Sequence, residues 1–196
     1  MNFYFIIYKP YGVLSQFSSA LNKQTLKDFF DVPEDVYAIG RLDEDSEGLL
    51  ILSNDKILNN KLLHPSFEHV REYLVQVDGV MNEHAIMLLQ QGLEINISGK
   101  LYTTKKCFAE LLKEHPEVAE RNPPIRVRKN IPTSWIKIRL TEGKNRQVRK
   151  MCAKAGFPVL RLIRIAIEDI QLGKLQPAEM IQLSKNVVYK KLFKQE

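Results

Sequence analysis

The chain of 196 residues is poor in the residues that build disulfide frameworks, metal sites and membrane spans. Its only cysteines, Cys107 and Cys152, lie far apart in the sequence, which argues against a disulfide framework. The four histidines have no spacing typical of zinc ligands, so we expect no metal site. No apolar stretch approaches the roughly 20 residues of a membrane-spanning helix. The N-terminal residues lack the basic leader of a secretory signal, and we therefore expect a cytoplasmic protein that contacts no membrane.

Length and charge bound the class of protein. A chain of this size buries roughly 70% of the surface that its unfolded form exposes, so a real core is available. We expect residues 1–196 to form a single domain of two sub-lobes that share a sheet. Lys and Arg total 29 against 23 for Asp and Glu, a net charge of +6. This balance favours a polyanionic partner such as nucleic acid without requiring one.

Hydrophobic periodicity predicts strands and helices that alternate without a regular βαβ rhythm. Strands are predicted at residues 2–8, 48–53, 71–79 and 134–140, and helices at 25–30, 82–91 and 145–155. Residues 121–132 contain three prolines and four basic residues without a regular period, and are predicted to be a loop. The mixture indicates an α+β fold with a mainly antiparallel sheet and flanking helices.

A dense group of carboxylates stands directly before a buried strand. Asp43, Glu44, Asp45 and Glu47 run into the apolar residues 49–52. The stretch "DEDSEG" (residues 43–48) matches the start of an EF-hand calcium loop, but its twelfth position is Asn54 rather than a bidentate Glu. A calcium loop is also followed by a helix, whereas a strand is predicted here, so we disfavour calcium binding.

A second charged group lies on the helix predicted at residues 145–155. At roughly 100° per residue, one face is apolar, with Val148, Met151, Cys152 and Ala155. The opposite face carries Arg146, Arg149 and Lys150. This basic stripe is either a solvated surface or an anion site that holds a phosphodiester backbone or a nearby carboxylate.

Four segments resemble, in order, the motifs of the RsuA-type pseudouridine synthases. They are "YKPYGVL" (8–14), "GRLDEDSEGLLILSND" (40–55), "REYLVQVDG" (71–79) and "EGKNRQVRKMCAKAGFPVLRLIRIAI" (142–167). The second segment matches the catalytic motif of that family, G-R-L-D-x-x-[ST]-x-G-L-L. Two departures are visible near the C-terminus: Glu168 stands where the family usually has Gly, and "PAEM" (177–180) stands for P-G-E-W.

The resemblance implies a fold and an activity. The expected fold has a mixed, mainly antiparallel sheet and a central active-site cleft. The segment from Arg121 to Ile138 resembles a branch of the family that acts on large-subunit ribosomal RNA. Most relatives carry an S4-type RNA-binding domain before the first motif, and we expect none here. The expected enzyme isomerises a uridine of ribosomal RNA to pseudouridine as a monomer, without cofactor or metal. The alternative is a non-catalytic RNA-binding or ribosome-assembly protein of the same fold.

The resemblance also implies roles for three catalytic residues. Asp43 matches the essential carboxylate; whether it attacks the sugar or the base, or takes a proton from the sugar, stays open. Burial raises the pKa of a carboxyl and a nearby cation opposes that rise, and Arg149 matches the family position of this cation. Tyr73 is either the ring that stacks on the uracil or an aromatic of the core.

Further residues are candidates for substrate binding. Leu162 packs beneath the base or Tyr73, or belongs to the plain core, and Arg41 either fixes the catalytic loop or intercalates to help flip the base. Glu44, Asp45 and Glu47 are expected to cap backbone of the loop and to pair with local cations. Flipping a uridine out of its stack costs a few kcal/mol, which phosphate contacts must offset. The candidate phosphate contacts are Arg121, Arg126, Arg128, Lys129, Lys144, Arg146 and Lys150.

Overall fold

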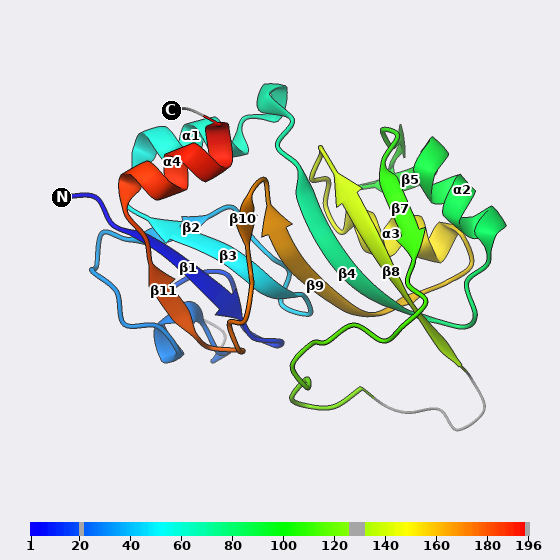
Figure 1. Cartoon of the computed structure of the whole chain (residues 1–196), viewed down its shortest axis with the longest axis horizontal. Helices are drawn as coiled ribbons and strands as arrows, with labels where there is room; N and C mark the ends of the chain where they lie inside the picture. The colour runs from blue at the N-terminus through cyan, green and yellow to red at the C-terminus, as the bar shows by residue number, and fades with distance from the viewer. Residues whose placement is uncertain (20–21, 126–131, 195–196) are drawn as a thin grey trace. The chain divides into compact units, whose positions relative to one another are not determined.

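The computed structural model describes residues 1–19, 22–125 and 132–194, and the chain forms two compact units (Figure 1). Unit 1 contains residues 1–69 and 163–196, and unit 2 contains residues 70–162. Strand β9 (Val159–Ile167) passes from unit 2 into unit 1. Three of the candidate phosphate contacts, Arg126, Arg128 and Lys129, lie outside the described residues.

The sheet of unit 1 is built around β3 (Glu47–Ser53), which follows the acidic stretch. Strand β1 (Tyr4–Lys9) pairs antiparallel with β3 along its whole length, and β11 (Met180–Gln182) adds to the far side of β1. Strand β2 (Tyr37–Ile39) pairs antiparallel with the end of β3, while β9 pairs parallel with its start. The short β10 (Ile170–Gln171) forms a hairpin with β9. The start of β3, next to the acidic stretch, is therefore held between two strands.

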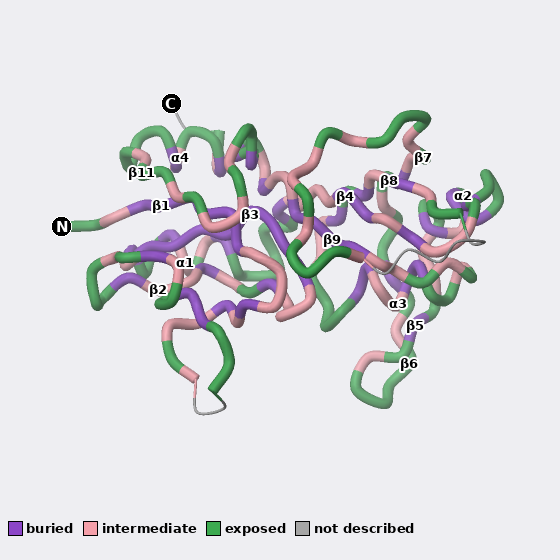
Figure 2. Tube along the Cα trace, turned by 90° about the horizontal axis from the view of Figure 1, so that it is seen from below, coloured by how far each residue is buried: buried purple, intermediate pink, exposed green. Residues whose placement is uncertain are grey.

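Strands β1 and β3 are buried over their whole length (Figure 2). One face of the pair contributes Phe5, Ile7, Leu50 and Leu52 to a core cluster that also contains Leu26, from the 3-10 helix η1 (Leu26–Asp28). On the opposite face, Tyr4 contacts Tyr189 of helix α4 (Lys185–Phe193), which lies beside α1 (Lys56–Leu63) in Figure 1. A second 3-10 helix, η2 (Pro65–Phe67), follows α1. Burial on both faces explains the continuous apolar run in β3.

Asp55 joins the elements on this second face. Its side chain caps α1 by accepting hydrogen bonds from the backbone N–H groups of Ile57 and Leu58. The other oxygen accepts from the hydroxyls of Tyr4 and Tyr189, each at 2.7 Å. Burial raises the pKa of the Asp55 carboxyl, but these hydrogen bonds outweigh burial, and the net pKa lies below its usual value.

Removal of the Asp55 carboxylate is expected to destabilise unit 1 in a pH-dependent way. Asp55→Ala leaves two tyrosine hydroxyls and two cap N–H groups without their acceptor, a loss of about 2–4 kcal/mol in the free energy of unfolding. Because the folded pKa is lowered, the stabilisation is present above the unfolded pKa of about 3.9 and is lost as the pH falls through the folded pKa. Asp55→Asn keeps the cap but should lack this acid-dependent loss. Denaturant unfolding of wild type, Asp55→Ala and Asp55→Asn at acidic and neutral pH measures both effects. If wild type and Asp55→Asn lost the same stability on acidification, the role of the Asp55 carboxylate would be contradicted.

Unit 2 contains three antiparallel strands in the order β4 (Arg71–Asp78), β8 (Thr133–Leu140) and β7 (Phe108–Leu111). A separate hairpin is formed by β5 (Glu94–Ile97) and β6 (Lys100–Thr103). Helices α2 (Glu83–Gln91) and α3 (Gln147–Lys154) pack their apolar residues into a core with Val75, Val77, Ile136 and Ile138 from β4 and β8. The alternating faces predicted for these two strands are confirmed.

The predicted α+β class with mainly antiparallel strands is confirmed, and β3 pairs parallel with β9. Helix α2 begins after Asn82, whose side chain accepts from the N–H of Ala85, and ends at Gly92, as predicted. The helix predicted at 25–30 is only a 3-10 turn. Among the described residues, no helix is long and apolar enough to cross a membrane.

The start of α3 was predicted too early. The helix begins at Gln147 rather than near Asn145, because the Gln147 side chain reaches back to accept a hydrogen bond from the N–H of Lys144. Arg146 is the residue before the helix and has a left-handed backbone with φ of 53°. Arg146 therefore does not belong to the helical stripe predicted with Arg149 and Lys150.

Candidate active site

Asp43 lies half-buried on the loop that leads into β3. The loop turns tightly, with the N–H of Ser46 donating to the Asp43 carbonyl at 3.0 Å. Gly48 lets β9 approach the start of β3: it has φ of 102°, and a Cβ at this position would lie 2.3 Å from the Arg164 carbonyl oxygen. Only glycine fits this conformation and this close approach. The backbone beside Asp43 is thus anchored to two strands.

The segment of residues 9–15, which we call the first-motif turn, holds the Asp43 loop from the other side. The Ser15 hydroxyl donates to the Leu42 carbonyl at 2.7 Å and accepts from the Leu42 N–H at 3.0 Å. The N–H of Gly12 donates to the Glu44 carbonyl at 2.8 Å. The residues on both sides of Asp43 are therefore hydrogen-bonded to this turn, which gives the carboxylate a defined position.

Lys9 is the buried centre of the first-motif turn. Its side chain is 0% exposed, at the end of β1 opposite Gly48. The ammonium donates to the carbonyls of Val13 at 2.6 Å and Pro10 at 2.8 Å, and lies 3.5 Å from the Glu44 carbonyl. One buried cation thus joins the turn to the loop that carries Asp43.

Lys9 also accounts for the carboxylates beside the buried strand. Burial lowers the pKa of the Lys9 ammonium to about 8, and the charges of Glu47, Asp45, Asp43 and Glu44 oppose that fall. The charges of the acidic stretch therefore favour the charged form of the buried lysine. This partner lies in the same unit as the acids, about 35 residues upstream of Glu44 in the sequence.

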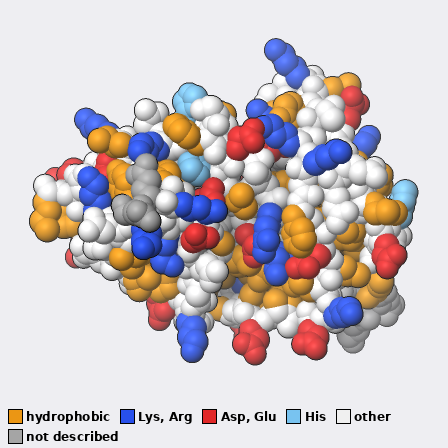
Figure 3. Space-filling model, turned by 45° about the horizontal axis from the view of Figure 1, so that its top comes forward, with side chains coloured by type: hydrophobic (Ala, Val, Ile, Leu, Met, Phe, Trp, Pro, Cys, Tyr) orange, Lys and Arg blue, Asp and Glu red, His pale blue; other side chains and the backbone are white. Residues whose placement is uncertain are grey.

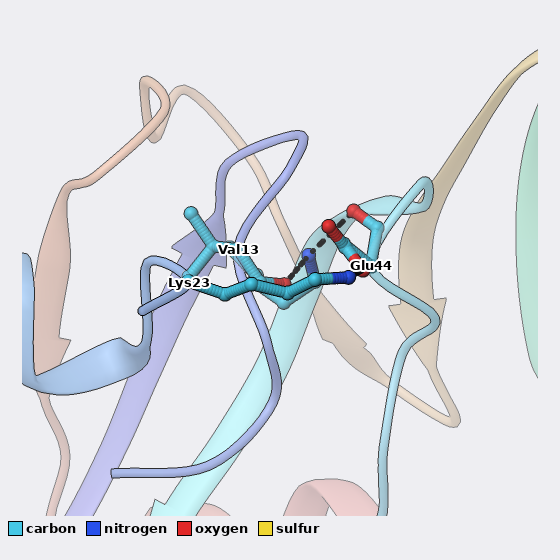
Figure 4. Close-up of polar contacts among 4 residues, drawn as sticks. Val13, Lys23 and Glu44 are labelled. Carbon is cyan, nitrogen blue, oxygen red and sulfur yellow. Dashed lines mark hydrogen bonds and ion pairs between the residues drawn. The ribbon is translucent and has the colours of Figure 1, made fainter. Parts of the chain in front are cut away.

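Glu44 has a second cation outside the core. Its carboxylate forms an ion pair with Lys23 at 2.7 Å, and both side chains are more than 40% exposed (Figure 4). The prediction that the flanking acids pair with local cations is confirmed for Glu44. Exposed pairs of this kind contribute little, about 0–1 kcal/mol.

Lys9→Met is expected to lower the free energy of unfolding by about 2–4 kcal/mol, because the Val13 carbonyl loses its buried donor and the acids lose their buried cation. Lys27→Met removes the same charge from an exposed position in unit 1 and should change stability little. Denaturant unfolding with both variants measures the difference. A loss below about 1 kcal/mol for Lys9→Met would contradict the role of this lysine.

Tyr73 and Leu162 share the core of unit 2. Leu162 is 6% exposed and belongs to the buried cluster, and Tyr73 packs against the same cluster while remaining half-buried. On β4, Tyr73 lies opposite Ile138 of β8. Both placements agree with the core alternative, and the half-exposed ring of Tyr73 also remains available for stacking.

Arg149 lies half-buried in the first turns of α3, and its Nη1 donates to the Val159 carbonyl at 3.4 Å. It belongs to unit 2 and Asp43 to unit 1, so the pairing of these two residues stays a prediction.

Arg41 is exposed on the loop before Asp43. Arg121 donates to the carbonyls of Pro123 and Leu160, which favours a bracing role in its own unit over a phosphate contact.

Comparison with known proteins decides the family. A family model described as RNA pseudouridylate synthase matches residues 3–154. The chain belongs to this family. The matched range contains the first-motif turn, Asp43, Tyr73 and Arg149, while Leu162 lies just beyond it. The non-catalytic alternative finds no support in these comparisons.

The relatives of this pseudouridylate synthase cover most of its length. It is 48% identical over 89% of its residues to "Ribosomal large subunit pseudouridine synthase E" of Vibrio parahaemolyticus, and this match covers 71% of that protein. A protein of the same name from Xanthomonas axonopodis is 44% identical over 88% of this chain and 89% of its own length. The solved "Crystal structure of pseudouridylate synthase" has a TM-score of 0.78 and 26% identity, over 98% of this chain and 74% of that one.

Sequence reasoning gave Lys9 and Ser15 no role, although both lie in or beside the first motif of this pseudouridylate synthase. The sequence gives no signal for the burial of Lys9, because a lysine at the end of a strand normally turns its ammonium to solvent. Ser15 offers no signal either, because its two hydrogen bonds to Leu42 join residues 27 apart in the sequence.

Proposed function

We propose that this chain isomerises a specific uridine of large-subunit ribosomal RNA to pseudouridine, with Asp43 as the essential carboxylate. The observation that carries the proposal is the Asp43 loop, which matches the family's catalytic motif and is fixed by Lys9, Gly12 and Ser15. A catalytic group needs such a defined position on a rigid support. The substrate class follows from the names of the relatives from Vibrio and Xanthomonas.

The reaction breaks the bond between the sugar and N1 of the uracil, turns the base, and rejoins it through C5, which loses its proton while N1 gains one. Product and substrate have the same atoms and the same oxidation state, so the chemistry requires no redox cofactor. Asp43 acts in its ionised form, as a nucleophile or as a base that takes a sugar proton. The uridine must first leave its stack, and the enzyme offsets the cost of a few kcal/mol with contacts to the flanking RNA.

The remaining residues act around Asp43 in this proposal. Arg149 supplies the cation that favours the ionised carboxylate. Tyr73 stacks on the uracil and Leu162 packs beneath the ring or beneath Tyr73. Arg41 fixes the loop or enters the space that the flipped base leaves.

Base-resolved pseudouridine mapping tests the function. Unmodified large-subunit ribosomal RNA is incubated with the wild-type chain and, in parallel, with Asp43→Asn. One new pseudouridine with the wild type alone supports the proposal and identifies the target nucleotide. The same incubation with assembling ribosomal particles distinguishes free RNA from a particle as substrate. RNA that is bound but unmodified in both forms would favour the non-catalytic alternative.

A further inference from the structure

Two exposed segments of unit 2 carry cations and no acid. The face of the molecule in Figure 3 mixes basic and acidic side chains, so a basic surface has to be located residue by residue. Residues 98–106, which we call the basic hairpin segment, contain β6 and its flanks, and residues 143–146, which we call the basic loop, precede α3. Together they carry five Lys or Arg and no Asp or Glu. These residues, all exposed, are Lys100, Lys105, Lys106, Lys144 and Arg146.

Glu142 joins the two segments. Its Oε2 accepts from the Tyr102 hydroxyl at 2.6 Å, and its Oε1 accepts from the Lys105 N–H at 2.9 Å, both in the basic hairpin segment. Oε1 also accepts from Nε2 of Gln147, the first residue of α3, at 2.5 Å. One carboxylate therefore ties the hairpin to the start of the helix that carries Arg149.

Tyr102 and Lys144 strengthen the same connection. The hydrogen bond to Glu142, together with burial, raises the pKa of Tyr102 to about 12, so the hydroxyl stays protonated and keeps donating. The Lys144 ammonium lies 4.7 Å from the centroid of the Tyr102 ring, within the range of a cation–π interaction. Lys144 of the basic loop is thus held over the hairpin.

The two segments gather five cations around a single joining acid. Glu142 accepts hydrogen bonds from the Tyr102 hydroxyl, the Lys105 backbone N–H and the Gln147 amide. The acid on β5, Glu94, points to the other face of the hairpin from Tyr102, because Tyr102 lies opposite Ile95 and side chains alternate along a strand. A polyanion that approaches this surface is attracted by these cations, and little backbone entropy is lost because Glu142 already holds the hairpin to the start of α3.

We propose that the basic hairpin segment and the basic loop, joined by Glu142, form a phosphate-binding surface for the backbone of the substrate RNA. The proposal rests on the proposed function, because the polyanion is the substrate RNA. It places the phosphate contacts on Lys100, Lys105 and Lys106 of the hairpin, which the sequence motifs do not indicate, together with Lys144 and Arg146. Glu142 and Tyr102 are positioning residues for this surface.

Salt-dependent binding tests the surface. The double variant Lys105→Gln/Lys106→Gln should bind ribosomal RNA fragments more weakly, and the slope of log affinity against log salt should fall by about 1.4–1.8, at about 0.7–0.9 for each lost contact. The control Lys190→Gln/Lys191→Gln removes the same charge from exposed positions of α4 in unit 1 and should leave the slope unchanged. Turnover on saturating RNA should stay within about twofold of wild type for the control variant. Equal slopes for the hairpin variant and wild type would overturn the surface.

Tyr102→Phe tests the connection without changing charge. It removes the hydrogen bond to Glu142 and keeps the ring beneath Lys144, so affinity should fall severalfold while the salt slope changes little. Wild-type affinity in this variant would overturn the positioning role. Thermal melting of each variant confirms that it is folded before binding is measured. The proposed function is judged separately: a wild type that forms no pseudouridine refutes the activity, whereas the binding slopes report on the surface alone.

Discussion

Asp43→Asn is expected to abolish uridine isomerisation while fold and RNA affinity stay nearly unchanged. The amide has the shape of the carboxylate, but it can act neither as a nucleophile nor as a base towards the sugar. The carbonyl of residue 43 still accepts from the Ser46 N–H, and the ties from Ser15 and Gly12 to the neighbouring residues involve only backbone of the loop. The substitution therefore removes the chemistry without releasing the loop.

Single-turnover rates and binding isotherms on the same RNA separate the two effects. A rate at least about 1,000-fold below wild type, with affinity within about threefold, is the expected result. Asp31→Asn is the matched control, because it removes an exposed carboxylate from the same unit and should behave as wild type. Residual turnover within tenfold of wild type would show that Asp43 is not the essential carboxylate.

Strands with a continuous or alternating apolar pattern were predicted from sequence, although the nine-residue β9 and the helices α1 and α4 were not. Strands β3, β4 and β8 each extend over seven or eight residues and were predicted from continuous or alternating apolar residues. Strands β5, β6 and β7 have four residues each, too few for a period to stand out. Helix α3 was predicted with the right apolar face but the wrong start, because Gln147 and Glu142 hold the preceding loop through side chains.

The structure explains why the family usually has glycine at the two positions near the C-terminus where this chain departs from its motifs. Glu168 and Ala178 both have left-handed backbones, with φ of 47° and 71°, and both stand where the family usually has glycine. A side chain in this conformation costs roughly 1–2 kcal/mol. Glu168 gains a compensating contact, since its carboxylate lies 3.0 Å from Nδ1 of His69. Sequence alone marked the positions but not the backbone conformation that makes glycine the usual choice.

The candidate site was predictable where the motif names a residue and not where burial decides. Asp43 and Arg149 follow from the resemblance to the family. Lys9 does not, because a lysine at the end of a strand normally turns its ammonium to solvent. Its burial depends on the Asp43 loop folding back over the first-motif turn, an arrangement set by hydrogen bonds between residues 27 to 35 apart in sequence.

Arg149→Ala is expected to reduce turnover about 100-fold or more and to leave RNA affinity much less affected. If Arg149 is the cation for Asp43, its loss withdraws the interaction that favours the ionised carboxylate during the reaction. Arg149→Lys keeps a charge without the planar fork and should recover part of the activity. Arg149→Ala also removes the hydrogen bond to the Val159 carbonyl, and this loss alone costs about 1 kcal/mol in the free energy of unfolding.

The free energies of unfolding of Asp43→Asn, Arg149→Ala and the double variant decide whether Asp43 and Arg149 interact. Arg149→Ala alone leaves the Asp43 charge without its cation, so unfolding should become easier by up to about 3–5 kcal/mol if the pair is fully buried, and by less for a half-buried Asp43. In the double variant the Asp43 charge is absent, and most of this cost should disappear. A coupling of about 0.5–3 kcal/mol between the substitutions would establish the pair. Strict additivity would mean that Arg149 serves the reaction or the RNA without contacting Asp43, and the buried Lys9 would then be the main cation that stabilises the acidic loop.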